Sequence, residues 1–186
     1  MIRAFYVGRF QPFHNGHARN VELISREVDE IVIGIGSAQK SHTTKNPFTA
    51  GERIEMISKA LKKFSKLHYI IPLEDVEYNA LWVSHVCSMS PKFDVVYSNN
   101  PLVVQLFTEA GVEVRNTPLH ERDKLSGTAI RKVMLECEND EWTDFVPPEV
   151  VDVIRDINGI ERMRNLNRPD RSFLPFSVNL PILFHP

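Results

Sequence analysis

The chain carries the stretch GRFQPFHNGH at residues 8–17, between an apolar segment and a predicted helix. Residues 2–7 are apolar, aromatic and β-branched, which is typical of a buried strand that ends at Gly8. Residues 17–28 place apolar side chains on one helical face. A strand that passes through a glycine-containing loop into a helix is typical of the α/β class.

Strand-like and helix-like segments continue to alternate through residue 135. The pattern predicts strands at 31–36, 68–72, 93–97 and 112–115, and helices at 79–89, 102–110 and 126–135. A further helix is expected after Thr49, which forms a capping box with Glu52. This order predicts a Rossmann-like, doubly wound parallel sheet with helices on both faces, whose ligands lie beyond the carboxyl ends of the strands.

The C-terminal quarter departs from the alternation. Residues 136–168 are expected to add a small helical part to the α/β domain of residues 1–135, with one helix that starts at Pro148 and is closed by Asn158-Gly159. Residues 169–186 are apolar but rich in proline, which predicts an irregular tail on its own domain or on a neighbouring subunit. An exchanged oligomerisation arm is the alternative.

Composition limits the class of protein. The 186 residues are 42% hydrophobic and 25% charged, with a net charge of −2, so polymeric nucleic acid is not expected as the main partner. The two cysteines have no CxxC spacing, and neither a signal peptide nor an apolar stretch of about 20 residues is present. We therefore expect a cytoplasmic protein without a membrane partner.

Residues 8–17 have the chemistry of a phosphate site. A helix start offers free N–H groups and the positive end of the helix dipole. Arg9 adds charge, Gly16 allows close approach, and His14 and His17 can each donate a hydrogen bond to a phosphate oxygen. A metal site would need His42 as a third ligand, with no carboxylate nearby.

A second candidate phosphate site begins at Ser126-Gly127-Thr128, where hydroxyl groups and N–H groups precede Arg131 by one helical turn. An ordinary capped helix is the alternative. Lys45, Arg122 and Lys124 are further basic candidates, although a solvated surface lysine would explain Lys45 equally simply.

Asn79 and Trp82 are three residues apart at a helix start and share one face. An indole ring can stack on a cationic pyridinium, and a side-chain amide can pair with a carboxamide. On the pattern alone, a core position is favoured for Trp82.

The stretch at 8–17 resembles the extended HxGH signature of the nucleotidylyltransferase superfamily, in the form found in archaeal-type nicotinamide-nucleotide adenylyltransferases. The resemblance continues through residues 36–43, 46–53, 79–83, 100–103 and 126–131, and it reaches about residue 166. Asn99 departs from the Ser-Gly-Asn expected at 98–100, and residues 169–186 lie outside the resemblance.

The resemblance implies that ATP and nicotinamide mononucleotide (NMN) react to give NAD⁺ and pyrophosphate. It also implies a homo-oligomer, specifically a hexamer. Because the sequence has no clear carboxylate cluster, Mg²⁺ is expected to be held mainly by nucleotide phosphates and water, with no protein metal ligands. The implied catalytic residues are Arg9, His14, His17 and Arg131. Nicotinamide would bind to Asn79 and Trp82. The implied ATP and phosphate contacts are Gly8, Phe10, Gln11, Gly16, Lys45, Arg122, Ser126, Gly127 and Thr128.

Two other functions share the phosphate motifs. One is nucleotidyl transfer to another acceptor, such as phosphopantetheine or flavin mononucleotide (FMN), and the other is a nucleotide-binding module without catalysis. Asn79 and Trp82 favour nicotinamide over these acceptors, but the amide of Asn79 leaves nicotinic acid mononucleotide open as a substrate.

Overall fold

The computed structural model describes residues 1–117, 125–136 and 139–168. Five strands form one parallel sheet in the order β3-β2-β1-β4-β5. Their bounds are β1 Arg3–Gly8, β2 Glu30–Ile35, β3 Leu67–Pro72, β4 Val95–Tyr97 and β5 Glu113–Arg115. Ala4 of β1 is paired with Ile31 on one side and with Val95 on the other. The predicted parallel α/β fold is confirmed.

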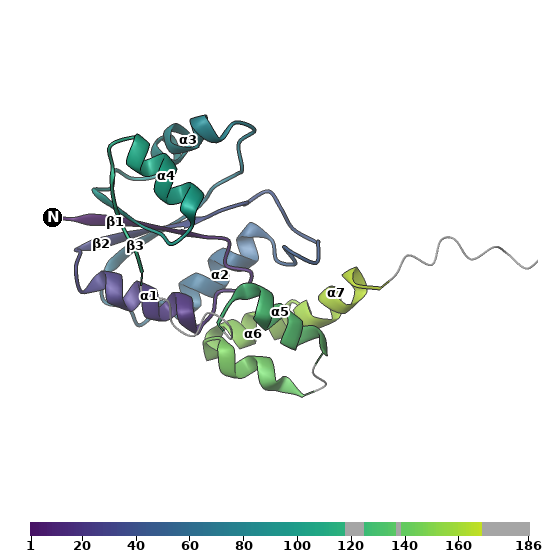
Figure 1. Cartoon of the computed structure of the whole chain (residues 1–186). Helices are drawn as coiled ribbons and strands as arrows, with labels where there is room; N and C mark the ends of the chain where they lie inside the picture. The colour runs from purple at the N-terminus through teal and green to yellow at the C-terminus, as the bar shows by residue number, and fades with distance from the viewer. Residues whose placement is uncertain (118–124, 137–138, 169–186) are drawn as a thin grey trace, which may run out of the picture.

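Helices cover both faces of the sheet (Figure 1). One layer contains α1 (Asn15–Ser25) and α2 (Ala50–Ala60), and the other contains α3 (Trp82–Met89) and α4 (Pro101–Glu109). The helices α5 (Gly127–Glu136), α6 (Pro148–Asp156) and α7 (Gly159–Leu166) follow the sheet and lie on the side of α1 and α2. Two short 3₁₀ turns, η1 (Asn79–Leu81) and η2 (Asp140–Phe145), complete the described elements.

Alternation along β1 divides the core between the two faces, because successive side chains of a strand point to opposite sides. Ala4 and Tyr6 belong to the cluster beneath α1 and α2, whereas Phe5 belongs to the cluster beneath α3 and α4. The first cluster also includes Ile154 of α6 and Met163 of α7. The C-terminal helices therefore pack on the same core as the sheet.

The order in which strands are added to the sheet reverses at β1. It adds β2 and β3 on one side and then returns to place β4 and β5 on the other. Loops that leave β1 and β4 diverge at such a switch point, and this opens a crevice beyond their carboxyl ends.

Three local features differ from the sequence expectation or refine it. The strand expected at 31–36 is shifted by one residue, to Glu30–Ile35, and contains Gly34. The expected helix from residue 79 starts as the η1 turn and becomes α-helical only at Trp82. Asn158, with a φ of 51°, separates α6 from an additional helix that begins at Gly159. Within the described residues, no helix has the length and apolarity that a membrane crossing requires. The tail at 169–186 lies outside the described residues.

Candidate active site

A pocket of about 740 Å³ lies at the switch point of the sheet. Its walls come from the loops after β1, β2 and β4, from the first turns of α1 and α5, and from the η1–α3 segment. Nine of the residues that the sequence singled out line it: Gly8, Arg9, His14, Gly16, His17, Asn79, Trp82, Ser126 and Gly127.

The two imidazoles of the HxGH motif are stacked, with ring centroids 3.5 Å apart and planes 24° apart. The backbone N–H of His14, at the N-cap of α1, donates to Nδ1 of His17 at 3.3 Å. A nitrogen that accepts a hydrogen bond carries no proton, so neutral His17 holds its proton on Nε2. His17 is therefore oriented as an Nε2–H donor.

Burial keeps both imidazoles neutral in the protein alone. It lowers the pKa of His14 to about 4. It also lowers the pKa of His17 well below its usual value, and the neighbouring His14 lowers it further. The two rings thus contribute hydrogen bonds rather than charge at neutral pH, and an anion bound between them would raise both pKa values.

Positive charge at the site comes from guanidinium groups. Arg9 lines the pocket, and the buried Arg131 lies behind it on α5. Burial, and then repulsion by Arg9, lowers the pKa of Arg131, although a guanidinium stays protonated at neutral pH. A bound anion between these two cations would relieve their repulsion.

Arg131 and Gln11 hold the two phosphate-site loops together. Arg131 donates to the carbonyl of Gln11 at 2.8 Å and to Oγ1 of Thr128 at 3.3 Å. Gln11 pairs with the backbone of Phe48 in both directions, at 2.9 and 3.0 Å. The buried side chains of Gln11 and Arg131 therefore support the pocket from behind, whereas Thr128 is exposed and is absent from the pocket lining.

Phe10 and the remaining basic candidates lie elsewhere. The Phe10 ring is buried in the core, 4.8 Å from the ring of His17. Lys45 is exposed on the loop before α2 and is absent from the pocket lining. Arg122 and Lys124 lie outside the described residues.

Trp82 both packs on the core and lines the pocket, the two roles that its sequence position allowed. Its ring packs against Phe107 of α4, with centroids 5.6 Å apart and planes 73° apart, and it also lines the pocket. Asp75 lies in the same wall, where it accepts from Ser37 Oγ at 3.0 Å and pairs with Lys40 at 2.7 Å. Burial alone would raise the pKa of Asp75, but Lys40 and Ser37 together hold it below its usual value.

The pocket lining also contains a polar group around Asn20 and Thr117 that was not predicted from the sequence. Asn20 lies one turn after His17 on α1 and donates to Tyr6 Oη at 3.3 Å and to Thr117 Oγ1 at 3.4 Å. Asn99 donates to the Thr117 carbonyl at 2.7 Å and accepts from its N–H at 3.1 Å. In the sequence, the only indication that Asn20 faces the pocket is its position three residues after His17, on the same helical face.

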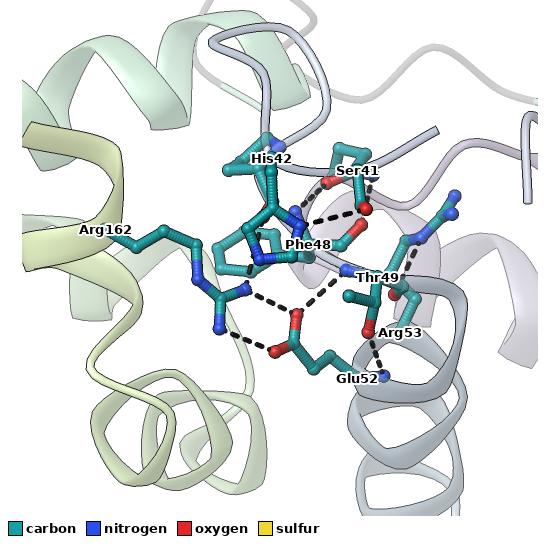
Figure 2. A network of polar contacts seen from close by, with 9 residues as sticks. Ser41, His42, Phe48, Thr49, Glu52, Arg53 and Arg162 are labelled. Atoms are coloured by element: carbon teal, nitrogen blue, oxygen red, sulfur yellow. Dashed lines mark hydrogen bonds and ion pairs between the residues drawn. The ribbon is translucent and has the colours of Figure 1, made fainter. Parts of the chain in front are cut away.

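The alternative metal site is not supported. Within the ranges that the structure describes, no three His, Cys, Asp or Glu side chains form a group that could hold a metal ion. His42 lies on an exposed loop with its Nδ1 3.0 Å from Ser41 Oγ (Figure 2), and it does not line the pocket.

Comparisons with known proteins identify the family of the chain. The family model described as cytidylyltransferase-like matches residues 5–133. A nicotinamide-nucleotide adenylyltransferase of Haloarcula marismortui is 58% identical over 169 residues, which cover 91% of this chain and 89% of the relative. The same name is carried by a relative from Methanothrix thermoacetophila that is 58% identical over 91% of this chain and 99% of its own length.

Solved structures share the fold at low sequence identity. A bifunctional NMN adenylyltransferase/ADP ribose pyrophosphatase from Francisella tularensis, complexed with AMP and a Mn ion, matches with a TM-score of 0.69 at 17% identity over 88% of this chain and 52% of that one. A Plasmodium falciparum nicotinic acid mononucleotide adenylyltransferase complexed with NaAD matches with a TM-score of 0.61 at 17% identity, over 86% of this chain and 97% of that one. With the family-model match and the high identity to the archaeal relatives, the chain belongs to the cytidylyltransferase-like family and, within it, to the nicotinamide-nucleotide adenylyltransferases.

Proposed function

We propose that this protein transfers the adenylyl group of ATP to NMN, giving NAD⁺ and pyrophosphate in NAD biosynthesis. The observation that carries the proposal is a single pocket with two parts. One part is a phosphate site around Arg9, His14 and His17, and the other is lined by the indole of Trp82 and the amide of Asn79. Archaeal relatives with this chemistry in their name are 54–58% identical to the chain.

The reaction needs positioning and charge neutralisation rather than a base. An oxygen of the NMN phosphate attacks the α-phosphorus of ATP, and the bond from that phosphorus to the oxygen bridging to the β-phosphate breaks. Because a phosphate monoester is already ionised at neutral pH, no side chain has to remove a proton. His17 Nε2–H, His14 and Arg9 would stabilise the charge that develops on the α-phosphoryl oxygens.

The second phosphate helix would hold the rest of the triphosphate. Ser126 and Gly127 line the pocket at the start of α5. A Cβ at Gly127 would lie 3.1 Å from the carbonyl oxygen of Gln11 and 3.2 Å from Arg131 Nη1, so a glycine suits this close approach. In this account Arg131 acts mainly by fixing the loop that carries His14, and Lys45 and Arg122 remain candidate phosphate contacts.

Divalent metal would enter with the nucleotide. Asp75 is the only carboxylate among the described residues that line the pocket, and it is paired with Lys40. Mg²⁺ usually keeps several waters and is shared with substrate phosphates, so this donor set fits an ion held by ATP rather than by the protein. The ion would neutralise charge on the triphosphate.

A cytoplasmic homo-oligomer is part of the same proposal. Tyr78, Leu81 and Met89 are large apolar side chains that are exposed in a single copy of the chain, and this supports burial in a partner surface. Light scattering after size exclusion would give the mass, with a hexamer expected from the family resemblance.

The test is pyrophosphate release from ATP and Mg²⁺ with four acceptors in parallel: NMN, nicotinic acid mononucleotide, phosphopantetheine and FMN. We expect release with NMN and formation of NAD⁺, identified by its mass. Replacing ATP with CTP is the matched control for the donor. Pyrophosphate release with phosphopantetheine or FMN alone would overturn the acceptor assignment. No release with any of the four acceptors would favour a non-catalytic binding module.

A further inference from the structure

Arg53 of α2 is a buried cation beneath the pocket. Its side chain is fully buried and donates to five backbone carbonyl groups. They belong to Arg9 and Gly36 at 2.9 Å each, Thr49 at 3.1 Å, Ser37 at 3.2 Å and Ala38 at 3.3 Å. Among the described residues no carboxylate hydrogen-bonds to it. Burial lowers the pKa of Arg53 to about 10, so it remains charged at neutral pH.

This guanidinium joins the ends of two neighbouring strands. A single nitrogen, Nη1, bonds the carbonyl of Arg9 after β1 and the carbonyl of Gly36 after β2. Arg9, Gly36 and Ser37 all line the pocket. The five bonds therefore fix the backbone from which two walls of the phosphate site project.

The backbone at both contacts has an unusual conformation. Phe10 and Ser37, which directly follow the two carbonyl groups held by Nη1, each have a φ of 50°. This left-handed region is unfavourable for residues with a side chain, and it persists only where the surroundings impose it. The Arg9–Phe10 and Gly36–Ser37 peptide units both accept a hydrogen bond from Arg53, so this side chain helps to hold both conformations.

Glu52, the residue before Arg53 in α2, makes a structural contact that does not involve the pocket. Glu52 points away from Arg53 and forms a two-bond ion pair with Arg162 of α7, at 2.8 Å for each bond (Figure 2). Arg162 also donates to the Pro47 carbonyl at 3.3 Å. Neither member of this pair lines the pocket, so the Glu52–Arg162 pair links helices without contacting the site.

We propose that Arg53 is a positioning residue for polyphosphate binding. It acts through Arg9, whose backbone it holds so that the side chain meets the phosphates, and through Ser37, whose hydroxyl donates to Asp75 of the pocket lining. Its own charge, one carbonyl away from the pocket surface, adds to the attraction for anions. The identification of that anion as a nucleotide phosphate chain rests on the proposed function.

Two substitutions separate the charge from the hydrogen-bond geometry. Arg53→Gln removes both, whereas Arg53→Lys keeps the charge but loses the planar fork that reaches several carbonyl groups. Arg162→Met is the matched control, because it removes a guanidinium of α7 that contacts the same end of α2 and does not line the pocket. Calorimetry would measure the binding of inorganic tripolyphosphate and of adenosine, and steady-state assays would give kcat and the KM for NMN.

We expect Arg53→Gln to weaken tripolyphosphate binding by about 10-fold or more, because the backbone of Arg9 and Ser37 loses its charge-assisted hydrogen bonds and the site loses one positive charge. Arg53→Lys should recover part of the affinity but remain about threefold weaker, with a lower kcat, because one ammonium cannot bridge five carbonyls. Adenosine affinity should be unchanged in both. Arg162→Met should lower Tm and leave both affinities unchanged.

Unchanged tripolyphosphate affinity in Arg53→Lys, with a Tm loss like that of Arg162→Met, would overturn the proposal and leave Arg53 a purely structural residue. A parallel loss of adenosine affinity would also overturn it, since general loosening of the pocket would then explain the result. Arg53→Lys carries the test if Arg53→Gln does not fold. Binding of tripolyphosphate requires no turnover, so failure of the proposed adenylyl transfer would be seen separately in the wild-type assay.

Discussion

The stacked pair His14 and His17 is the residue-scale feature on which the proposed chemistry depends. Neither ring carries a charge at neutral pH in the protein alone, so their contribution has to be directional. The backbone N–H that donates to His17 Nδ1 sets that direction by leaving the proton on Nε2. A donor fixed in this way strengthens most for the oxygen whose charge grows in the transition state.

We therefore expect His17→Ala to reduce kcat by about 10²–10³-fold, the range seen when one preorganised donor is removed. The KM for NMN should change much less, because the lost bond matters most in the transition state. Steady-state kinetics would measure both. His68→Gln on β3, outside the pocket lining, is the control and should behave as wild type. Equal losses in kcat and in NMN affinity would contradict this role.

Stability should depend on pH through the same pair. The pKa of His14 is about 4 in the folded protein and 6.5 as its usual value, so between these limits the unfolded chain binds a proton that the folded protein does not. Unfolding is then favoured as pH falls from about 6.5 towards 4, by up to about 3 kcal/mol for His14 alone. Urea denaturation at pH 7.5 and pH 5 would measure the loss. His14→Gln should lose less between the two pH values, and an equal loss in both proteins would refute the assignment.

Trp82 offers a third residue-scale prediction. Its ring contacts Phe107 on one side and the pocket on the other, so it can orient a flat ring from a fixed position. Trp82→Ala should raise the KM for NMN by about 10-fold or more, because stacking on an indole face contributes about 1–2 kcal/mol when the site is desolvated. Trp82→Phe should recover part of this loss. An unchanged KM in Trp82→Ala would exclude stacking on NMN.

Residues within one motif could be placed in the pocket from sequence, because neighbours in a loop at a strand end share one location. Gly8, Arg9, His14 and His17 follow this rule. Arg53 and Asn20 could not be placed, since, apart from Thr49, their partners lie 14 to 97 residues away along the chain. Only the folded sheet brings those segments together.

At the scale of elements, apolar runs and caps located the strands and helices well. The capping box of Thr49 and Glu52 is present, with Glu52 N–H bonded to Thr49 Oγ1 at 3.2 Å. The need for a glycine at position 34 could not be predicted from such local signals. A Cβ there would lie 2.7 Å from the Phe5 ring and 2.8 Å from Leu73, and neither neighbour is near it in sequence.

Gly34→Ala should therefore destabilise the protein by about 1–3 kcal/mol, the usual cost of overpacking a core. Gly51→Ala is the matched control on α2, where the nearest atom to a new Cβ is 3.9 Å away. Alanine should stabilise that helix by about 0.5–1 kcal/mol, because it restricts the unfolded chain more than glycine does. Urea denaturation would measure both, and equal effects at the two glycines would contradict the packing argument.

The molecule as a whole consists of one sheet with a core on each face and a pocket at its edge. Trp82 belongs to the pocket wall and packs on the core beneath α3 and α4, whereas Trp142 is buried in the core shared with α6 and α7. Among the described residues, the two cores lie on opposite faces of the same strands. Since both need the same five-stranded sheet, neither should persist after the other is lost.

The two tryptophans make this whole-molecule expectation measurable, because they are the only ones in the chain. Trp142→Phe leaves Trp82 as the reporter of one core, and Trp82→Phe leaves Trp142 as the reporter of the other. Within each variant, the urea midpoint from fluorescence should coincide with the midpoint from far-ultraviolet circular dichroism, because a cooperative domain unfolds in one step. If Trp142 reported an earlier transition than the circular dichroism signal, the helices after α5 would be a separate unit. The sheet walls of the pocket would then stay folded after α6 and α7 had unfolded and the Glu52–Arg162 ion pair between α2 and α7 had been lost.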